Sequence, residues 1–280
     1  MKKRREYVAV LAFLAAIIGI SGCSRQKEEK LTKYDTQFFE LFDTVTSVTG
    51  YARDEKTFQS YVDVFYDELK EYHQLYDIYN DYEGINNIKT INDHAGIEPV
   101  GVDDKIIQML EEAVDIYELT DGNMNVAMGS VLSIWHEYRE AGLKHPEQAQ
   151  LPPQEELEEA AKHMDIRKMV IDPEKKTVYL EDPDMSLDVG AIAKGYAAEM
   201  ASRKVEEAGL KHALISVGGN IRCIGTKPDG QKWVVGVQNP DTTSGERYLH
   251  RLGLDGMSLV TSGTYQRYYT VDGVNYHHII

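Results

Sequence analysis

The chain has 280 residues, 42% of them hydrophobic and 27% charged, a balance typical of a folded protein. This length suffices for one large or two medium globular domains with a substantial core. The formal net charge of −16 makes the chain a poor candidate for sequence-independent nucleic-acid binding, because the phosphate backbone would repel it.

The first 22 residues have the pattern of a bacterial lipoprotein signal peptide. The basic segment MKKRREY precedes the apolar run VAVLAFLAAIIGI, which is too short for a comfortable membrane span. Small residues directly before Cys23 resemble a lipobox, which implies cleavage there and a diacylglycerol anchor on the sulfur. We therefore expect a protein anchored at the extracytoplasmic face of the cell membrane, with an uncleaved membrane helix as the alternative. Residues 23–35, charged and poor in bulky side chains, are expected to be the tether.

The chain up to about residue 164 contains one predicted strand and several predicted helices. Residues 38–52 alternate and are rich in β-branched side chains, which predicts a strand. Apolar side chains at helical spacing predict a helix over 54–76, and an Asp start with a Gly beyond the end predicts another over 103–122. After an irregular stretch and a further helix, a Pro- and Gln-rich excursion precedes a short helix near 155–164.

The second half is rich in predicted strands. MVIDPEKKTVYLE predicts a hairpin, a helix is expected over 189–208, and HALISVGGNIRCIG predicts a strand broken by a double glycine. Two further strands flank the DG of SLVTSGTYQRYYTVDGVNYHHII. Strands and helices do not strictly alternate, so we expect an α+β fold with mixed or antiparallel sheets. Cys223, within a strand-like run, is expected to be a small buried hydrophobe rather than a nucleophile.

The segment DVGAIAKGYAAE (188–199) has the composition of an anion site. Gly190 and Gly195 would let the backbone approach a ligand closely, and a helix N-terminus attracts negative charge. Lys194 adds a mobile positive charge about one turn into the helix, which suits a phosphate or pyrophosphate. Asp188 is expected either to cap the helix or to accept a hydrogen bond from a ligand. An ordinary capped helix with a solvated lysine is the alternative reading.

Two later segments could contribute to the same site. The glycines of SVGGN suit close approach of a flat ligand, although a β-bulge explains them equally well. Thr261 and Ser262 could donate to phosphate oxygens or form a simple turn. His277 and His278 would face opposite sides of a strand, so at most one points into a given site. Walker, Rossmann, G-x-S-x-G, H-E-x-x-H and C-x-x-C motifs are absent from the sequence.

Six segments occur in one order: FDT, TDGNMNVAMG, DVGAIAKGYA, VGGNI, TSGTYQRYY and YHHII. In this order they resemble the ApbE family of flavin transferases (FAD:protein FMN transferases), from about residue 38 to the end. The resemblance implies an α+β fold of two T-fold-like halves with FAD in the cleft between them, and we assign residues 36–280 to this domain.

The resemblance also implies an activity. The family uses Mg²⁺ to cleave the pyrophosphate of FAD, passes FMN to a Thr or Ser hydroxyl of an acceptor protein, and releases AMP. Acceptors are FMN-bearing subunits of Rnf- and Nqr-type redox complexes and related extracytoplasmic flavoproteins. Two alternatives stay open: an FAD pyrophosphatase that gives free FMN and AMP, and a lipid-anchored FAD-binding protein without catalysis.

Site residues follow from the resemblance by position. It assigns FAD contacts to Phe42, Asn123, Met124, Asn125, Asp188, Lys194, Asp255 and Met257. It places Lys194, Thr261 and Ser262 beside the scissile phosphates, and gives the backbone carbonyl of Ala191 to the metal. Asn125 and Ala127 depart from the family's usual Asp and Thr. Because the family's side-chain metal ligands would follow Ile280, we expect the chain to be a fragment.

Overall fold

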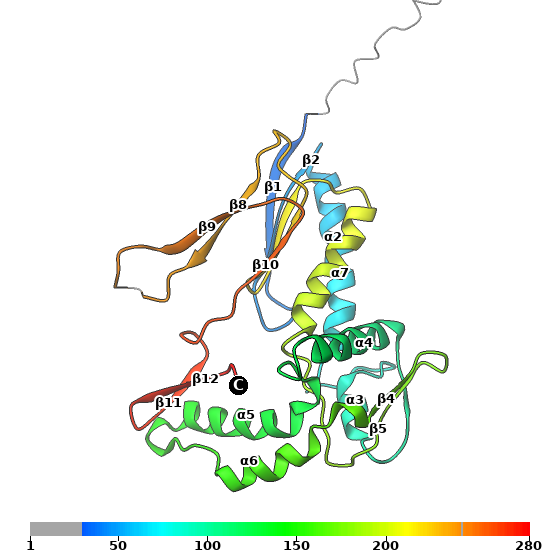
Figure 1. Cartoon of the computed structure of the whole chain (residues 1–280). Coiled ribbons are helices and arrows are strands. Elements are labelled where there is room, and N and C mark those ends of the chain that lie inside the picture. Colours follow the sequence, from blue (N-terminus) through cyan, green and yellow to red (C-terminus); the bar gives the residue numbers. More distant parts are fainter. Residues whose placement is uncertain (1–29, 242) are drawn as a thin grey trace, which may run out of the picture.

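The computed structural model describes residues 30–241 and 243–280 (Figure 1). The signal peptide and Cys23 lie outside these residues, as does most of the expected tether. Among the helices described, none is long and apolar enough to cross a membrane.

A five-stranded antiparallel sheet forms the upper part of the molecule. Its order is β1 (Thr32–Phe38), β2 (Thr46–Ala52), β6 (Ala213–Val217), β7 (Asn220–Ile224) and β10 (Ser258–Val260). Two helices, α2 (Glu55–Leu75) and α7 (Ala193–Glu207), lie side by side over one face of this sheet (Figure 1). The alanines of α7 at 197, 198 and 201 are buried, and such small side chains let the two helices approach closely.

The lower part of the molecule is mostly helical. It contains α3 (Ile88–Asp93), α4 (Asp104–Leu119), α5 (Gly129–Lys144) and α6 (Gln154–Ala160). A small sheet of order β3-β5-β4 (Val100–Gly101, Thr177–Leu180 and Met169–Asp172) packs beside α3 and α4. Short 3₁₀ turns occupy Val126–Met128, Pro146–Gln148, Ala161–His163 and Ile166–Lys168.

Two ribbons of paired strands complete the fold. The ribbon of β8 (Trp233–Gln238) and β9 (Tyr248–Leu254) projects from the sheet, and that of β11 (Tyr268–Val271) and β12 (Val274–His277) lies beside α5 (Figure 1). All these pairings are antiparallel, so the expected α+β class with antiparallel sheets and packed helices is confirmed.

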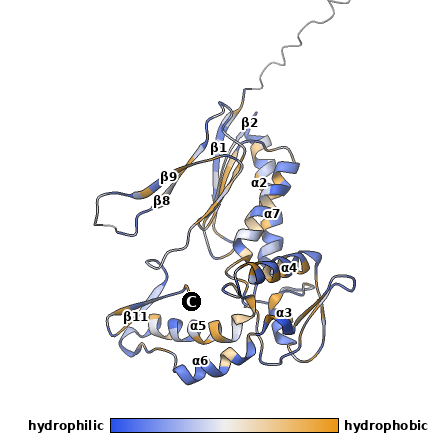
Figure 2. Ribbon diagram, in the orientation of Figure 1, coloured by the Kyte–Doolittle hydropathy of each residue, from blue (hydrophilic) through white to orange (hydrophobic). Residues whose placement is uncertain are grey.

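One large apolar core joins the sheet, α2, α7 and the lower helices, and hydrophobic residues concentrate between these elements (Figure 2). Phe65, Leu69 and Ile215 are almost completely buried in it. A smaller cluster forms where Trp233 of β8 packs near Cys223. Cys223 is buried, and burial raises its thiol pKa to about 11, so the expectation of an inert hydrophobe is confirmed.

The single strand expected over 38–52 is wrong. Two strands, β1 and β2, flank a turn in which Phe42 and Asp43 have positive φ, a conformation that ends a strand. The alternating pattern did not show this break, because no glycine or proline marks it. Strand β1 begins at Thr32, so residues 32–35 belong to the sheet rather than to the tether.

The glycine pair of SVGGN makes a hairpin turn instead of a break within one strand. Gly218 and Gly219 have φ of +55° and +91°, and two such residues fit the tight turn that joins β6 to β7. Asp272 and Gly273 make the expected turn between β11 and β12 in the same way.

Candidate functional site

Two turns meet at the lower end of the five-stranded sheet. The Gly218 N–H donates to the carbonyl of Val45 (3.0 Å), which joins the hairpin turn to the residue after Thr44. A Cβ on Gly218 would lie 2.3 Å from Thr44 Oγ1, so only glycine fits here. The FDT segment and the VGGN segment are therefore packed directly against each other.

A second junction brings the segments around Val126 and Asp188 together. Asp188 N–H donates to Val126 O (2.8 Å), and Gly129 N–H donates to Ser186 O (2.9 Å). The Asn92 amide bonds both backbone groups of Leu187, at 2.7 and 3.0 Å. These bonds hold the chain that leads into α7 against the start of α5.

The N-terminus of α7 lacks a side-chain cap. The helix begins at Ala193, four residues later than expected, and its N-cap residue Ile192 supplies no capping bond. Asp188 instead accepts from the N–H of Gly190 (2.8 Å), so the possibility that Asp188 caps this helix is wrong. The uncapped N–H groups and the helix dipole together favour an anion at this point.

Lys194 lies in the first turn of α7 and is half-buried. Burial and repulsion from Arg267 lower the pKa of Lys194, and Asp43 only partly offsets them. Within the described chain no carboxylate lies close enough to Lys194 to form a salt bridge. A pair of neighbouring cations at a helix N-terminus is suited to a phosphate or pyrophosphate.

Arg267 comes from the TSGTYQR segment and is held by the C-terminal ribbon. Its carbonyl accepts from the His278 N–H (3.0 Å), and the His278 Nδ1 lies 3.2 Å from the same oxygen. Burial lowers the pKa of His278, and the positive charges of Arg267 and Arg139 lower it further although the backbone bond opposes them. Arg267 thus brings positive charge to the site from a segment far along the chain.

Thr261 and Ser262 follow β10 directly and are exposed. The last residue of β10, Val260, pairs with Asn220, and a Cβ on Gly195 would lie 3.6 Å from Asn220 Oδ1. The chain therefore leaves the sheet near the start of α7, which is where the two hydroxyls are expected. Gly195 makes no close contact that requires glycine, so it leaves space over the helix start.

Tyr79 is a site residue that the sequence analysis missed. Its exposed ring packs on His136 of α5, with 5.6 Å between ring centroids. Burial of the hydroxyl raises the pKa of Tyr79, and the nearby charge of Asp188 raises it further. The available signal was an aromatic residue within the Asn- and Asp-rich loop after α2.

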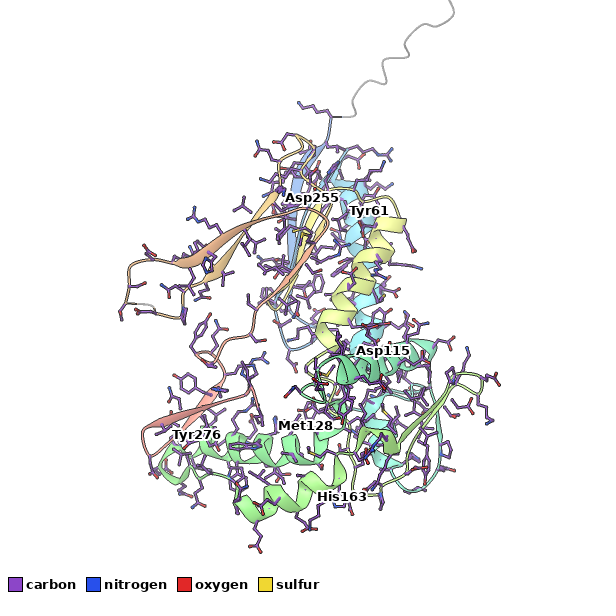
Figure 3. All side chains as sticks on the ribbon, viewed as in Figure 1. Tyr61, Asp115, Met128, His163, Asp255 and Tyr276 are labelled. Carbon is purple, nitrogen blue, oxygen red and sulfur yellow. The ribbon has the colours of Figure 1, made fainter. Side chains whose placement is uncertain are left out.

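Other expected site residues are placed differently. Asp255 and Met257 lie at the far end of the sheet: Cys223 N–H donates to Met257 O (3.0 Å), and Figure 3 shows Asp255 well above Met128. The structure therefore does not bring these two residues to Lys194. Both residues lie in the short connection between β9 and β10, whose position in the fold no local sequence pattern indicated.

The GNMN segment is held by its own hydrogen bonds. Asn125 accepts from the Ala127 N–H (2.8 Å) and donates to Met164 O (2.9 Å), so both ends of its amide are engaged. Asn123 is exposed and donates to Thr120 O (2.7 Å), whereas Met124 packs against the core. Phe42 lies half-buried beside His73, in the strained turn after Leu41.

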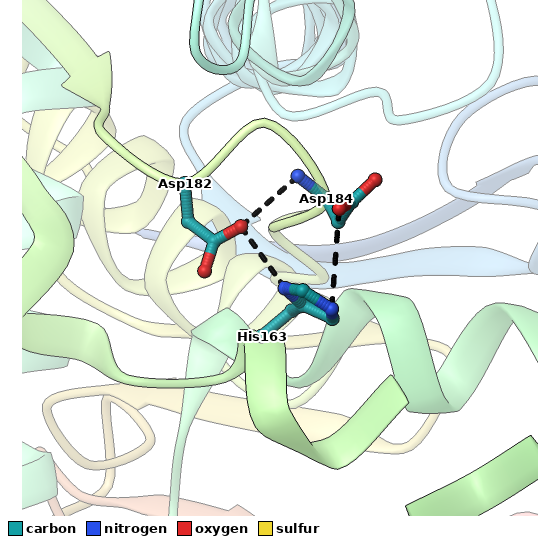
Figure 4. A group of neighbouring side chains, drawn as sticks. All are labelled: His163, Asp182 and Asp184. Atoms are coloured by element: carbon teal, nitrogen blue, oxygen red, sulfur yellow. Dashed lines mark hydrogen bonds and ion pairs between the residues drawn. The ribbon is translucent and has the colours of Figure 1, made fainter. Parts of the chain in front are cut away.

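The metal contact expected at the Ala191 carbonyl stays a prediction, because its side-chain ligands were expected after Ile280. Ala191 is exposed in the turn before α7, and the described residues gather no three metal-ligating side chains there. The one such group they contain is His163, Asp182 and Asp184 (Figure 4). His163 and Asp184 also line a hollow of about 760 Å³ beside α5 and α6. Lys194 does not line that hollow.

Both carboxylate oxygens of Asp182 already have partners within the protein. One oxygen interacts with His163 Nδ1 (3.0 Å) and accepts from the Asp184 N–H (3.1 Å), and the other accepts from Lys168 Nζ (2.7 Å). We interpret this group as a structural ion-pair network.

This network makes an acid-sensitive contribution to stability. The bond from Lys168 lowers the pKa of Asp182 to about 2, below its ordinary value of 3.8. Because the pKa of Asp182 is lower in the folded state, the ionised carboxylate stabilises the fold above about pH 4. This stabilisation is lost as the pH falls toward 2. We expect Asp182→Asn to lower the free energy of unfolding by about 1–2 kcal/mol at neutral pH, after allowance for solvent screening, and the difference to vanish near pH 2. Urea unfolding at several pH values measures this; a pH-independent difference would contradict it.

The fold and the site together define a class: an α+β protein with an uncapped helix N-terminus and converging cations that suit a phosphorylated ligand. Comparison with known proteins identifies a family within this class. The model of the ApbE family matches residues 42–280. The chain is 30% identical to the FAD:protein FMN transferase of Klebsiella pneumoniae (74% of this chain, 62% of the relative) and 33% to that of Treponema pallidum (69% and 55%).

Solved structures agree. The ApbE protein of Thermotoga maritima superposes with a TM-score of 0.75 at 28% identity, covering 89% of this chain and 76% of that one. The flavin transferase ApbE of Vibrio cholerae shares the fold, with a TM-score of 0.70 at 22% identity over 89% and 76% of the two chains. The chain belongs to the ApbE family. It spans less than two thirds of the length of the two curated relatives named above.

Proposed function

We propose that the protein transfers the FMN half of FAD to a Thr or Ser hydroxyl of an acceptor protein and releases AMP. The observation that carries this proposal is the half-buried Lys194, unpaired among the described residues, beside Arg267 at the uncapped start of α7. Membership of the ApbE family and the names of its curated relatives support FAD as the phosphorylated ligand.

The reaction replaces the phosphoanhydride bond between FMN and AMP by a phosphoester bond between FMN and the acceptor. The acceptor oxygen forms a bond to the FMN phosphorus, the bridging P–O bond of the pyrophosphate breaks, and AMP takes the electron pair. Lys194 and Arg267 neutralise charge that grows on the phosphate oxygens, and the free N–H groups of α7 orient them. Thr261 and Ser262 donate to the same oxygens. The nucleophile comes from the partner protein, and its hydroxyl proton passes to the departing AMP phosphate or to solvent, so this chain needs no catalytic triad.

Three elements of the proposal rest on the resemblance. Mg²⁺ would supply additional charge neutralisation at the pyrophosphate, although the described residues do not assemble its ligands. The proposed acceptors are FMN-bearing subunits of Rnf- or Nqr-type complexes or related extracytoplasmic flavoproteins. The acidic chain would meet them outside the cytoplasmic membrane.

Mass spectrometry tests the function directly. The full gene product is incubated with FAD and an Rnf- or Nqr-type acceptor domain, with and without Mg²⁺. We expect the acceptor to gain the mass of FMN and AMP to appear in equal amount. Free FMN and AMP with an unmodified acceptor would instead establish a pyrophosphatase. Intact FAD under all conditions would establish a flavin carrier.

The membrane location is part of the same proposal and is supported by the leader sequence. We expect Cys23→Ser to abolish metabolic labelling with a radioactive fatty acid, because the sulfur is the attachment point. Cys223→Ser is the matched control, since Cys223 is buried in the folded domain and should leave labelling unchanged. Undiminished labelling of the Cys23 variant would contradict the lipoprotein assignment.

A further inference from the structure

The turn that carries the FDT segment is strained. Phe42 has φ of +56° and Asp43 has φ of +49°, so two consecutive non-glycine residues adopt the left-handed conformation. This conformation is unfavourable for residues with a Cβ and persists only where the surroundings impose it. Asp43 is the acidic group that opposes the cationic repulsion on Lys194, so the turn borders the proposed phosphate site.

A chain of hydrogen bonds from α2 holds this turn. The Phe42 N–H donates to Nδ1 of His73 (3.3 Å), and the two rings meet edge to face at 5.4 Å. On its other side, His73 Nε2 lies 3.4 Å from the Tyr82 hydroxyl oxygen. Tyr82 in turn donates to Asp77 Oδ2 (2.8 Å).

Asp77, at the end of this series of hydrogen bonds, is held in place by backbone groups. Asp77 accepts from the N–H groups of Tyr79 (2.7 Å) and Asn80 (3.0 Å). Burial raises the pKa of Asp77, but the hydrogen bonds from Asn80, Tyr79 and Tyr82 outweigh burial, so the group stays ionised. Tyr82, whose pKa burial and Asp77 raise to about 12, stays protonated.

The hydrogen bonds on either side of His73 define which of its ring nitrogens carries a proton. Tyr82 has one hydroxyl proton, which it donates to Asp77, so its oxygen must accept from His73 Nε2. At the other ring nitrogen, Nδ1 accepts from the Phe42 N–H and therefore carries no proton. The Tyr82 end requires a proton on Nε2 and the Phe42 end requires none on Nδ1, so the two ends together define a neutral ring with its proton on Nε2.

We propose that His73, neutral and protonated on Nε2, is a positioning residue that holds the strained Phe42–Asp43 turn against the Lys194 site. His73 acts through Phe42 and Asp43 and touches neither phosphate nor acceptor. Its effect on transfer rests on the proposed function, but its tautomer and its effect on FAD binding can be measured without transfer.

The tautomer is tested first. In the full-length protein labelled with ¹⁵N-histidine, at mildly alkaline pH, we expect the His73 ring to show a protonated Nε2 and an unprotonated Nδ1. The resonance is assigned by its loss in His73→Gln. A ring with its proton on Nδ1, or a fast mixture of tautomers, would overturn the proposal.

Three substitutions separate positioning from general stability. His73→Asn keeps an acceptor oxygen near the position of Nδ1, whereas His73→Gln places its amide near Nε2 and His73→Ala has neither. We expect the Gln and Ala variants to weaken FAD binding and lower kcat/KM for transfer about tenfold, and the Asn variant to recover most of both. His94→Gln is the control, because His94 is equally half-buried but bonds only to Thr90 of its own helix.

The outcomes distinguish this proposal from the proposed function. Normal binding in all three variants, or equal loss in all three, would overturn the positioning role. If FAD binds with the expected order of affinities but no acceptor is modified, the proposed transfer fails while the role of His73 stands.

Discussion

Replacing Lys194 by alanine is expected to lower the rate of FMN transfer about 100-fold or more and to leave the fold intact. Removing one preorganised positive or hydrogen-bonding group from developing phosphate charge typically has an effect of this size. The fold should survive because Lys194 forms no salt bridge in the described structure, and its burial beside Arg267 is itself unfavourable.

The same chemistry predicts a proton linkage. Burial and Arg267 lower the pKa of Lys194 in the free protein, and a bound phosphate would raise it again. FAD binding at alkaline pH should therefore take up protons, and calorimetric titration in buffers with different ionisation enthalpies measures this uptake. The Lys194→Ala variant should lose it.

Lys204→Ala is the matched control for Lys194→Ala. Lys204 lies on the same helix, is exposed, and is far from the first turn, so transfer should be unchanged. Transfer rates and thermal unfolding midpoints are measured for both variants. An unchanged rate in Lys194→Ala would remove this residue from the mechanism, and a collapse in its thermal midpoint would assign it a structural role.

Replacing Gly129 by alanine is expected to lower the free energy of unfolding by about 2–3 kcal/mol, the scale of overpacking in a tight interior. A Cβ at this position would lie 2.4 Å from the carbonyl oxygen and 2.6 Å from the carbonyl carbon of Ser186. Both atoms belong to the backbone, so they cannot turn aside as a flexible side chain would. Gly129 has an ordinary helical φ of −55°, so the clash alone causes the loss.

The Gly129→Ala variant should also bind FAD more weakly. Ser186 leads directly to Asp188, so displacing its carbonyl moves the chain that enters α7. Gly101→Ala is the control, because its added Cβ meets nothing within 4 Å and its φ is not left-handed. Denaturant unfolding and flavin titration measure the two effects. Equal stability of Gly129→Ala and the parent protein would contradict the prediction, because it would show that the Ser186 carbonyl can move at no energetic cost.

Local periodicity predicted the regular elements well. Apolar residues at helical spacing marked α2 within one residue at each end, and the Asp–Gly pair marked the turn between β11 and β12. In both cases the signal lies within a few residues of the element that it describes. Strand β9 was missed because its side chains are mostly exposed and show no alternation of buried and polar positions.

Some residues of the candidate site could be recognised from the sequence and others could not. Lys194 and its glycines stand out locally, and the order of six short segments identified the family. Arg267, Tyr79 and the His73 chain could not be inferred, because they approach α7 from other elements. The capping role considered for Asp188 was wrong, because its backbone bonds Val126 and its side chain accepts from Gly190 N–H, while the helix begins only at Ala193.

By itself, the sequence determined the class of fold, the family, the lysine at a helix start and the lipoprotein leader pattern. Each depends on neighbouring residues or on their order. Only the tertiary structure decided where α7 begins, that Thr44 packs on Gly218, and that His73 holds a strained turn. These features depend on contacts between distant segments, where steric exclusion and hydrogen-bond satisfaction override local preference.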